Sequence, residues 1–191
     1  MTKDTQKHKK QPLLKLANGA YECVELLAFT VMIIFLLTIF LFRHSVVVGP
    51  SMQRTLENGN HLIISDLFYQ PKTGDIVVFD DLSIDDKSEG VSSSLIKRVI
   101  ATEGQHVKIT TDAIYVDDVK LEEDYAYFDA QNSDFYEPME LTVPEGKVFV
   151  LGDHRNNSWD SRRFECVDER AIVGRALVRL SPFTIYLRNG K

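Results

Sequence analysis

The N-terminal part of the chain is dominated by one long apolar stretch. Residues 26–42 contain no charged side chain, and extending the stretch back to residue 23 gives 20 residues. A helix rises about 1.5 Å per residue, so this one would be about 30 Å long, the thickness of a bilayer's hydrocarbon core. No polar face appears at any helical phase. We therefore predict a transmembrane anchor over 23–42 rather than a buried helix of a soluble core.

A cleavable signal peptide is the alternative interpretation of this stretch. Its apolar region would be shorter, and a small-x-small cleavage site would follow. Here Arg43, His44 and Ser45 follow, and three valines come next, which favours a retained anchor. Lysines concentrate before the stretch. The positive-inside rule then predicts a single-pass protein of the cell membrane, with residues 1–22 as a cytoplasmic tail and the remainder extracytoplasmic.

Beyond the anchor the pattern changes to period two and to short β-rich runs. Turn signals separate the runs, as at residues 71–74 and 144–146, and no long amphipathic segment intervenes. Residues 43–191 are therefore predicted to form a mainly β catalytic domain of antiparallel strands, with a β-rich cap or insertion at about 106–147. The strand candidates are residues 61–64, 75–79, 95–101, 107–111, 113–116, 147–151 and 172–180.

Two segments do not fit the strand pattern. Residues 80–94 are rich in Asp, Ser and Gly, offer little to bury, and are expected to form a mobile loop. Residues 120–143 are acidic and aromatic, and we interpret their rings as surface packing of a cap rather than a binding site. These rings belong to Tyr125, Tyr127, Phe128, Phe135 and Tyr136.

The charge distribution limits the classes of partner. The net charge is −6, and five lysines and three acidic residues lie in residues 1–25, which leaves 17 basic against 25 acidic side chains beyond them. An acidic domain repels polyphosphate, so nucleic-acid binding is disfavoured. Cys23 and Cys166 fall on either side of the anchor and lack metal-ligand spacing, so both are interpreted as structural, without a disulfide or a zinc site.

Residues 49–56 are the first candidate for chemistry. Gly49 and Pro50 interrupt the preceding valine run and place Ser51 on a turn. A nucleophile needs such a position, where its hydroxyl projects and its own backbone N–H can face the developing oxyanion. A serine on a turn is common, so this signal alone is weak.

Residues 95–100 form a strand with charge at its centre. Side chains alternate between faces, so Lys97 should share one face with Val99, and Arg98 the other. A lysine on an apolar face is costly when charged. Being mostly neutral at pH 7 would require its pKa to fall by about 3.4 units, within the range that desolvation can supply. A neutral amine can accept a proton from a serine, although a snorkelling lysine at a sheet edge gives the same pattern.

A buried strand at residues 148–151 runs into a dense polar loop at 152–162. So many hydrogen-bonding side chains in succession suit a network that holds other groups in place. His154 lies beside an aspartate in this loop, and His61 and His106 are also available, so a Ser/His/Asp triad stays open at this point.

Together these segments resemble the bacterial type I signal peptidase family, the leader peptidases with a Ser/Lys dyad. Residues 49–56 are similar to its nucleophile box, whose core reads Ser-Met-x-Pro-Thr-Leu. Residues 74–79 resemble its next box, and residues 97–100 the box of the general-base lysine. Residues 152–162 resemble its last box, Gly-Asp-Asn-Arg-x-x-Ser-x-Asp-Ser-Arg. The four segments occur in family order behind an N-terminal anchor.

The resemblance implies a role for individual residues. Ser51 would be the nucleophile and Lys97 the general base of a membrane-anchored serine endopeptidase that removes signal peptides from exported preproteins. Ser158 would orient the lysine amine, and Asp160 and Arg162 would form a supporting ion pair. The Ser51 backbone N–H would donate to the oxyanion.

The resemblance also implies substrates and partners. Small residues would be preferred at positions −1 and −3, typically Ala-x-Ala, with Met52 and Val99 as candidate substrate contacts. The expected partners are preprotein signal peptides, the lipid bilayer and protein export machinery nearby, and no nucleic acid. No metal or organic cofactor is expected.

Some positions depart from the family pattern. Arg54 stands where the nucleophile box has proline, and Gly49 where some relatives have a serine that helps the oxyanion. Residues 101–105 replace a Gly-x-Pro-Gly-Asp-like turn, and Glu165 follows Phe164 where glycine is usual. None of these changes removes a proposed catalytic residue. They suggest a specialised paralogue with a narrower client set.

Three other functions are compatible with parts of the pattern. An inactive, membrane-tethered β-module would keep the fold without needing the dyad. A self-cleaving repressor-type protease would need an Ala-Gly or Cys-Gly bond, and neither dipeptide occurs. A Ser-x-x-Lys cell-wall acyl enzyme would match residues 94–97 by sequence, but the expected helix start is missing.

Overall fold

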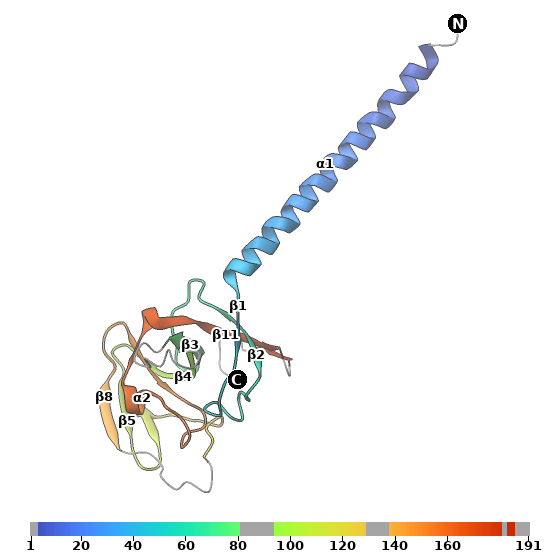
Figure 1. Cartoon of the computed structure of the whole chain (residues 1–191). Coiled ribbons are helices and arrows are strands. Elements are labelled where there is room, and N and C mark those ends of the chain that lie inside the picture. The colour runs from blue at the N-terminus through green and yellow to red at the C-terminus, as the bar shows by residue number, and fades with distance from the viewer. Residues whose placement is uncertain (1–3, 81–93, 129–137, 181–182, 186–191) are drawn as a thin grey trace, which may run out of the picture. The chain divides into compact units, whose positions relative to one another are not determined.

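The computed structural model describes residues 4–80, 94–128, 138–180 and 183–185. The chain divides into two compact units, Met1–Leu41 and Phe42–Lys191. The first unit contains a single α-helix, α1 (Asp4–Leu41), which Figure 1 shows as one continuous helix. The predicted loop at 80–94 and the predicted cap at 120–143 fall partly outside the described residues.

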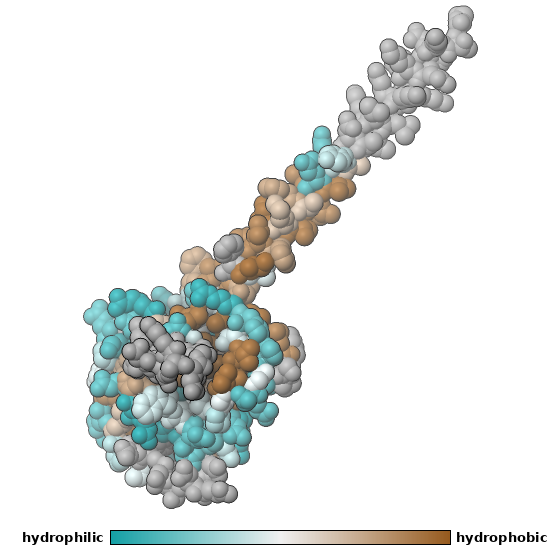
Figure 2. All heavy atoms as spheres, in the orientation of Figure 1, coloured by the Kyte–Doolittle hydropathy of each residue, from teal (hydrophilic) through white to brown (hydrophobic). Residues whose placement is uncertain are grey.

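Helix α1 carries the apolar stretch on all its sides. A window of 21 residues, Gly19–Ile39, has a mean hydropathy of 2.2, and none of it is buried. Figure 2 shows mostly hydrophobic residues on the visible face of this part of α1. A helix that is apolar all round and unburied fits a membrane span better than a core helix of a soluble protein.

The second unit is built on an eight-stranded sheet with the order β1-β2-β11-β3-β4-β9-β10, in which β12 also pairs with β11. Every pairing in this sheet is antiparallel, as the sequence predicted. Its strands are β1 (Arg43–Val46), β2 (His61–Ser65), β3 (Ile76–Asp80), β4 (Ser94–Thr102), β9 (Lys147–Leu151), β10 (Val167–Asp168), β11 (Ile172–Leu180) and β12 (Phe183–Ile185).

A second sheet of four strands occupies the part of the chain predicted as a cap, with the order β7-β6-β5-β8. Figure 1 shows β5 and β8 at the side of the domain away from β1 and β2. A common core joins the two sheets, because Ile100, Phe149 and Leu151 of the large sheet pack with Val107 and Ile114 of the small one. The strands are β5 (His106–Ile109), β6 (Ile114–Val116), β7 (Val119–Lys120) and β8 (Met139–Thr142).

The strands that carry the candidate site lie at the centre of the large sheet. Strand β4 pairs with β3 on one side and with β9 on the other. Residues 96–101 of β4 are all buried, so the strand is a rigid interior element. The only helical segments described in this domain are short: α2 (Ser161–Phe164) and the 3₁₀ turn η1 (Glu169–Ala171). A sheet made this way holds side chains at fixed spacing, which the site depends on.

Candidate active site

Ser51 lies on a turn that follows β1, as predicted. Gly49 has φ +92°, a left-handed conformation that suits glycine, and its N–H donates to the Asn58 side chain at 3.0 Å. Met52 and Leu56 are buried with Val47 in the core, so they anchor the turn on its inner side. These contacts hold the turn against the core, while Ser51 itself stays half-buried.

The structure brings Lys97 to this serine. Lys97 lies in the middle of β4, opposite Val77 of β3. Its Nζ donates to Ser51 Oγ at 2.9 Å and to the Ile96 carbonyl at 3.1 Å. Only 2% of Lys97 is exposed, so the amine meets the hydroxyl with little water around it.

Burial changes the proton affinity of the lysine. It lowers the pKa of Lys97 from 10.5 to about 8, against the charges of Asp160 and then Asp153, which favour the protonated amine. The shift is smaller than the sequence argument required for a mostly neutral amine at pH 7. At that pH about one lysine in ten is neutral, and half are neutral near pH 8. An amine in that range can accept a proton from a neighbouring hydroxyl.

Ser158 lies near the dyad but lacks the predicted hydrogen bond to the lysine. Its Oγ is buried and has no partner in the described part of the chain. Gly152 separates it from the nucleophile: a Cβ on Gly152 would lie 2.2 Å from Ser158 Oγ and 2.6 Å from the Ser51 carbonyl oxygen. The missing side chain at 152 therefore permits the close approach of the two serine segments.

Asp160 and Arg162 form the predicted ion pair. Arg162 donates through Nε and Nη2 to the two carboxylate oxygens, at 2.8 and 2.7 Å. Asp160 is fully buried, accepts the Gly152 N–H at 3.1 Å, and caps the start of α2. Its carboxylate thus ties the polar loop together behind the lysine that it also influences.

The two predicted substrate contacts lie in the core. Met52 is 1% exposed and packs with Val47 and Leu56, whereas Val99 is fully buried in a separate cluster with Val77 and Val150. In the free chain neither side chain is open to a ligand. Their proposed role in substrate selection stays a prediction.

A second buried ion pair was not predicted from the sequence. Arg98 donates to both oxygens of Asp153 at 2.8 and 2.7 Å, and Thr55 Oγ1 donates to the same carboxylate at 2.5 Å. The pair therefore connects β4 to the nucleophile turn. An arginine inside the apolar run 95–100 was the available signal, because a buried charge needs a partner.

None of the three candidate histidines serves Ser51 as a base. His61 Nδ1 lies 2.8 Å from His44 Nε2, and His106 pairs with Glu140 at 3.1 Å. The ring of His154 reaches the Pro50 carbonyl instead of the Ser51 hydroxyl. The Ser/His/Asp alternative is therefore not formed in this structure. No three His, Cys, Asp or Glu side chains in the described ranges converge as metal ligands.

A serine hydroxyl bonded to a buried lysine, on an antiparallel β domain that follows an apolar helix, is the arrangement expected of a serine peptidase of the Ser/Lys type. Residues 20–181 match the family model described as signal peptidase, peptidase S26. The chain belongs to this family.

Two relatives that are more than 30% identical to the chain agree with that assignment. The chain is 34% identical over 165 residues to a probable signal peptidase I-1 of Synechocystis, covering 84% of this chain and 82% of that protein. It is 36% identical over 160 residues to a signal peptidase I of Bacillus caldolyticus, covering 77% and 84%. A crystal structure of a signal peptidase I from Enterococcus faecalis V583 shares 31% identity, with a TM-score of 0.45, over 56% of this chain and 97% of that one.

Proposed function

We propose that this chain removes signal peptides from exported preproteins by an acyl-enzyme mechanism, with Ser51 as nucleophile and Lys97 as general base. The observation that carries the proposal is the 2.9 Å hydrogen bond between Lys97 Nζ and Ser51 Oγ, with the lysine buried and its pKa lowered to about 8. Membership of the signal peptidase family supplies the substrate class.

The first half of the reaction forms the acyl-enzyme. Neutral Lys97 takes the Ser51 proton as the hydroxyl oxygen attacks the scissile carbonyl. The Ser51 backbone N–H has no acceptor among the described residues, so it is available to the oxyanion of the tetrahedral intermediate. When the intermediate collapses, the protonated lysine gives its proton to the leaving amine, and the signal peptide remains as an ester on Ser51.

The second half releases the signal peptide. Lys97 is neutral again and takes a proton from a water molecule, which attacks the ester carbonyl. The signal peptide leaves with a free carboxylate, and the proton returns to Ser51 Oγ. A covering substrate would exclude water further and lower the lysine pKa beyond its value in the free chain. This further fall would supply the rest of the pKa shift that Lys97 needs to be mostly neutral at pH 7.

Ser158 has a role only once substrate binds. Its unpaired, buried hydroxyl is free to accept a hydrogen bond from the Lys97 amine when that amine turns away from Ser51. We expect Ser158→Ala to lower cleavage about 10- to 100-fold without lowering the melting temperature, because no hydrogen bond of the free chain is lost. Equal losses of activity and stability would assign Ser158 a structural role instead.

The family resemblance and helix α1 support the rest of the proposal, which concerns substrate binding and membrane orientation. The substrate would add as a strand to an exposed sheet edge and present small residues at −1 and −3, typically Ala-x-Ala. Helix α1 would cross the cell membrane once with residues 1–22 in the cytoplasm, and hold the domain in the same layer as its membrane-bound substrates. Labelling of single cysteines added at each end of the full chain in which Cys23 and Cys166 are replaced by serine, in intact cells, tests that orientation.

The deciding experiment compares detergent-solubilised full-length variants on a preprotein that carries Ala-x-Ala. Ser51→Ala and Lys97→Ala should abolish cleavage. Lys108→Ala, which removes a half-exposed lysine of β5, is the matched control and should cleave normally. Equal cleavage by all four proteins would contradict the dyad, whereas no cleavage by any of them would favour the inactive β-module.

A further inference from the structure

His154 holds both peptide carbonyls that flank the nucleophile. Its backbone N–H donates to the Ser51 carbonyl at 3.0 Å, and its ring Nδ1 lies 3.3 Å from the Pro50 carbonyl oxygen. A carbonyl oxygen only accepts, so Nδ1 carries the hydrogen and donates it. Nε2 is buried with no partner among the described residues, so the bond to Pro50 is the ring's single hydrogen bond there.

The bond to Pro50 acts on the oxyanion donor through the peptide plane. The carbonyl of Pro50 and the N–H of Ser51 belong to one planar trans peptide, so fixing the direction of the first fixes the direction of the second. A hydrogen bond accepted by the carbonyl also polarises the amide and makes its N–H a better donor. Gln53 N–H donates to the same oxygen at 3.0 Å, so two donors hold this peptide.

The His154 ring is itself fixed by Tyr127. The two ring centroids lie 4.7 Å apart at an interplanar angle of 50°. Their backbones form an isolated parallel bridge, in which Tyr127 N–H donates to the Asp153 carbonyl at 2.7 Å and Arg155 N–H donates to the Tyr127 carbonyl at 2.8 Å. His154 is 4% exposed, so ring and backbone are both held in a packed environment.

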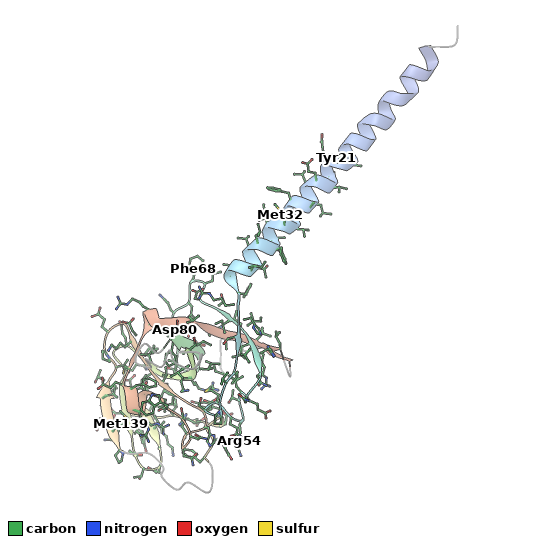
Figure 3. All side chains as sticks on the ribbon, viewed as in Figure 1. Tyr21, Met32, Arg54, Phe68, Asp80 and Met139 are labelled. Atoms are coloured by element: carbon green, nitrogen blue, oxygen red, sulfur yellow. The ribbon has the colours of Figure 1, made fainter. Side chains whose placement is uncertain are left out.

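Arg54 contacts the same tyrosine from the nucleophile turn. Its guanidinium lies 4.5 Å from the Tyr127 ring centroid, within the range of a cation–π contact. Figure 3 labels Arg54 at the end of the domain away from Phe68. Arg54 adopts φ +76°, which a proline cannot reach, and it stands where the family box has proline. His154 likewise stands where that box has asparagine.

Arg54 and His154, two residues that depart from the family boxes, therefore both contact the Tyr127 ring. Arg54 belongs to the turn that carries Ser51, and His154 is hydrogen-bonded to it. We propose that His154, held by Tyr127 and Arg54, is a positioning residue that sets the direction of the Ser51 N–H toward the oxyanion. The proposal rests on the proposed peptidase function. It assigns a function to Tyr127, which the sequence argument treated as surface packing.

The test separates transition-state stabilisation from substrate binding. His154→Phe keeps an aromatic ring against Tyr127 but removes the donor to Pro50. We expect it to lower kcat about 10- to 100-fold with little change in KM. It should weaken binding of a peptide aldehyde, which forms an oxyanion adduct on Ser51, by a similar factor. Binding of the non-covalent product peptide, and the pH at which activity falls on acidification, should not change.

Tyr127 provides a second variant in case His154→Phe fails to fold. Tyr127→Leu removes the ring that packs against His154 and should show a weaker form of the His154→Phe pattern. His106→Phe, a half-buried histidine on β5, is the matched control and should leave every readout unchanged.

The possible results distinguish two failures. Wild-type kcat and aldehyde affinity in a folded His154→Phe, or equal loss of aldehyde and product-peptide affinity, would overturn the positioning role. A Ser51→Ala variant that cleaves as well as the wild type would overturn the proposed function itself. If neither single-site variant of His154 or Tyr127 changes kcat while Ser51→Ala is inactive, only the positioning role fails.

Discussion

The two partners of the dyad are held by different kinds of structure. Lys97 lies inside the nine-residue strand β4, between two hydrogen-bonded neighbours, and its position follows from the sheet ladder. Ser51 lies on a turn outside any strand, and side chains distant in sequence fix it: His154 binds its carbonyl and Asp153 binds Thr55. A regular element therefore places the base, and a set of tertiary contacts places the nucleophile. Changes on the two sides should have different consequences.

The largest effect should come from Lys97→Met, which removes the base from its strand. Cleavage should fall by at least about 10⁴-fold, as for loss of a core member of a catalytic unit. The free energy of unfolding should rise at the same time. The lowered pKa of about 8 means that the protonated lysine destabilises the fold by about 3 kcal/mol relative to a fully solvated one.

The pH dependence of that gain has a definite sign. Between pH 8 and 10.5 the unfolded lysine binds a proton that the folded lysine has lost, so wild-type stability contributed by this group rises with pH. The advantage of Lys97→Met should be full below pH 8 and should disappear toward pH 10.5. Denaturant unfolding at several pH values measures it, with Lys108→Met as the exposed control. A variant less stable than the wild type at pH 7 would contradict the account.

The next-largest effect should come from breaking the buried ion pair that connects β4 to the nucleophile turn. Arg98→Met leaves the fully buried Asp153 without its cation, which typically costs about 3–5 kcal/mol. Because the same carboxylate binds Thr55, cleavage should fall as well. Arg170→Met is the control, since the Arg170 side chain is 90% exposed in its pair with Asp168 and the substitution should leave stability almost unchanged. Similar losses in the two variants would mean that the buried pair does not couple β4 to the turn.

A smaller change would disturb the nucleophile side alone. Gly152→Ala places a methyl group 2.6 Å from the Ser51 carbonyl oxygen, a backbone atom that cannot turn away. We expect a loss of about 1–3 kcal/mol in stability and at least a tenfold loss in kcat/KM. The matched change Gly19→Ala meets no atom within 4 Å and should have little effect. Normal cleavage by Gly152→Ala would show that the turn is less constrained than its contacts imply.

The smallest effect is a gain in stability. Glu165 has φ +67° and ψ −155°, a conformation that belongs almost entirely to glycine, and the family usually has glycine there. Glu165→Gly should raise the free energy of unfolding by about 1–2 kcal/mol while cleavage stays unchanged. Glu145→Gly, at an exposed position without a positive φ, should bring no gain. Thermal unfolding of the three proteins decides between these outcomes.

The regular part of the fold was predictable because its signals are local. Period-two runs identified the strands that became β2, β3, β4, β5, β6, β9 and β11, and the uncharged stretch identified the apolar helix. Strands β1, β7, β8, β10 and β12 were not among the predicted runs. Strands β7 and β10 have only two residues each, which is too short for an alternating pattern. The charged residues Lys97 and Arg98 inside an apolar strand were visible, and they mark the buried hydrogen bond to Ser51 and the buried ion pair with Asp153.

The nucleophile side was predictable only in part. A turn at Ser51 follows from Gly49 and Pro50, but its meeting with Lys97 came from the family resemblance. The contacts of Tyr127 with Arg54 and His154 join segments more than 25 positions apart, and no spacing along the chain encodes them. Ser158 was expected on the lysine but has no partner in the described part of the chain, and the amine donates instead to Ser51 and to the Ile96 carbonyl.

The most direct measurement is the pH dependence of kcat/KM for cleavage of an Ala-x-Ala preprotein, which reports the ionisation of the free enzyme. Activity should rise tenfold per pH unit and level off near pH 8, where Lys97 loses its proton. Of the two carboxylates that favour the protonated amine, Asp160 has the larger effect on the Lys97 pKa. Asp160→Asn removes this charge and should move the rise in activity to lower pH. A rise near the ordinary histidine range of about 6.5 that disappears in His154→Phe would contradict the account and identify a histidine as the base.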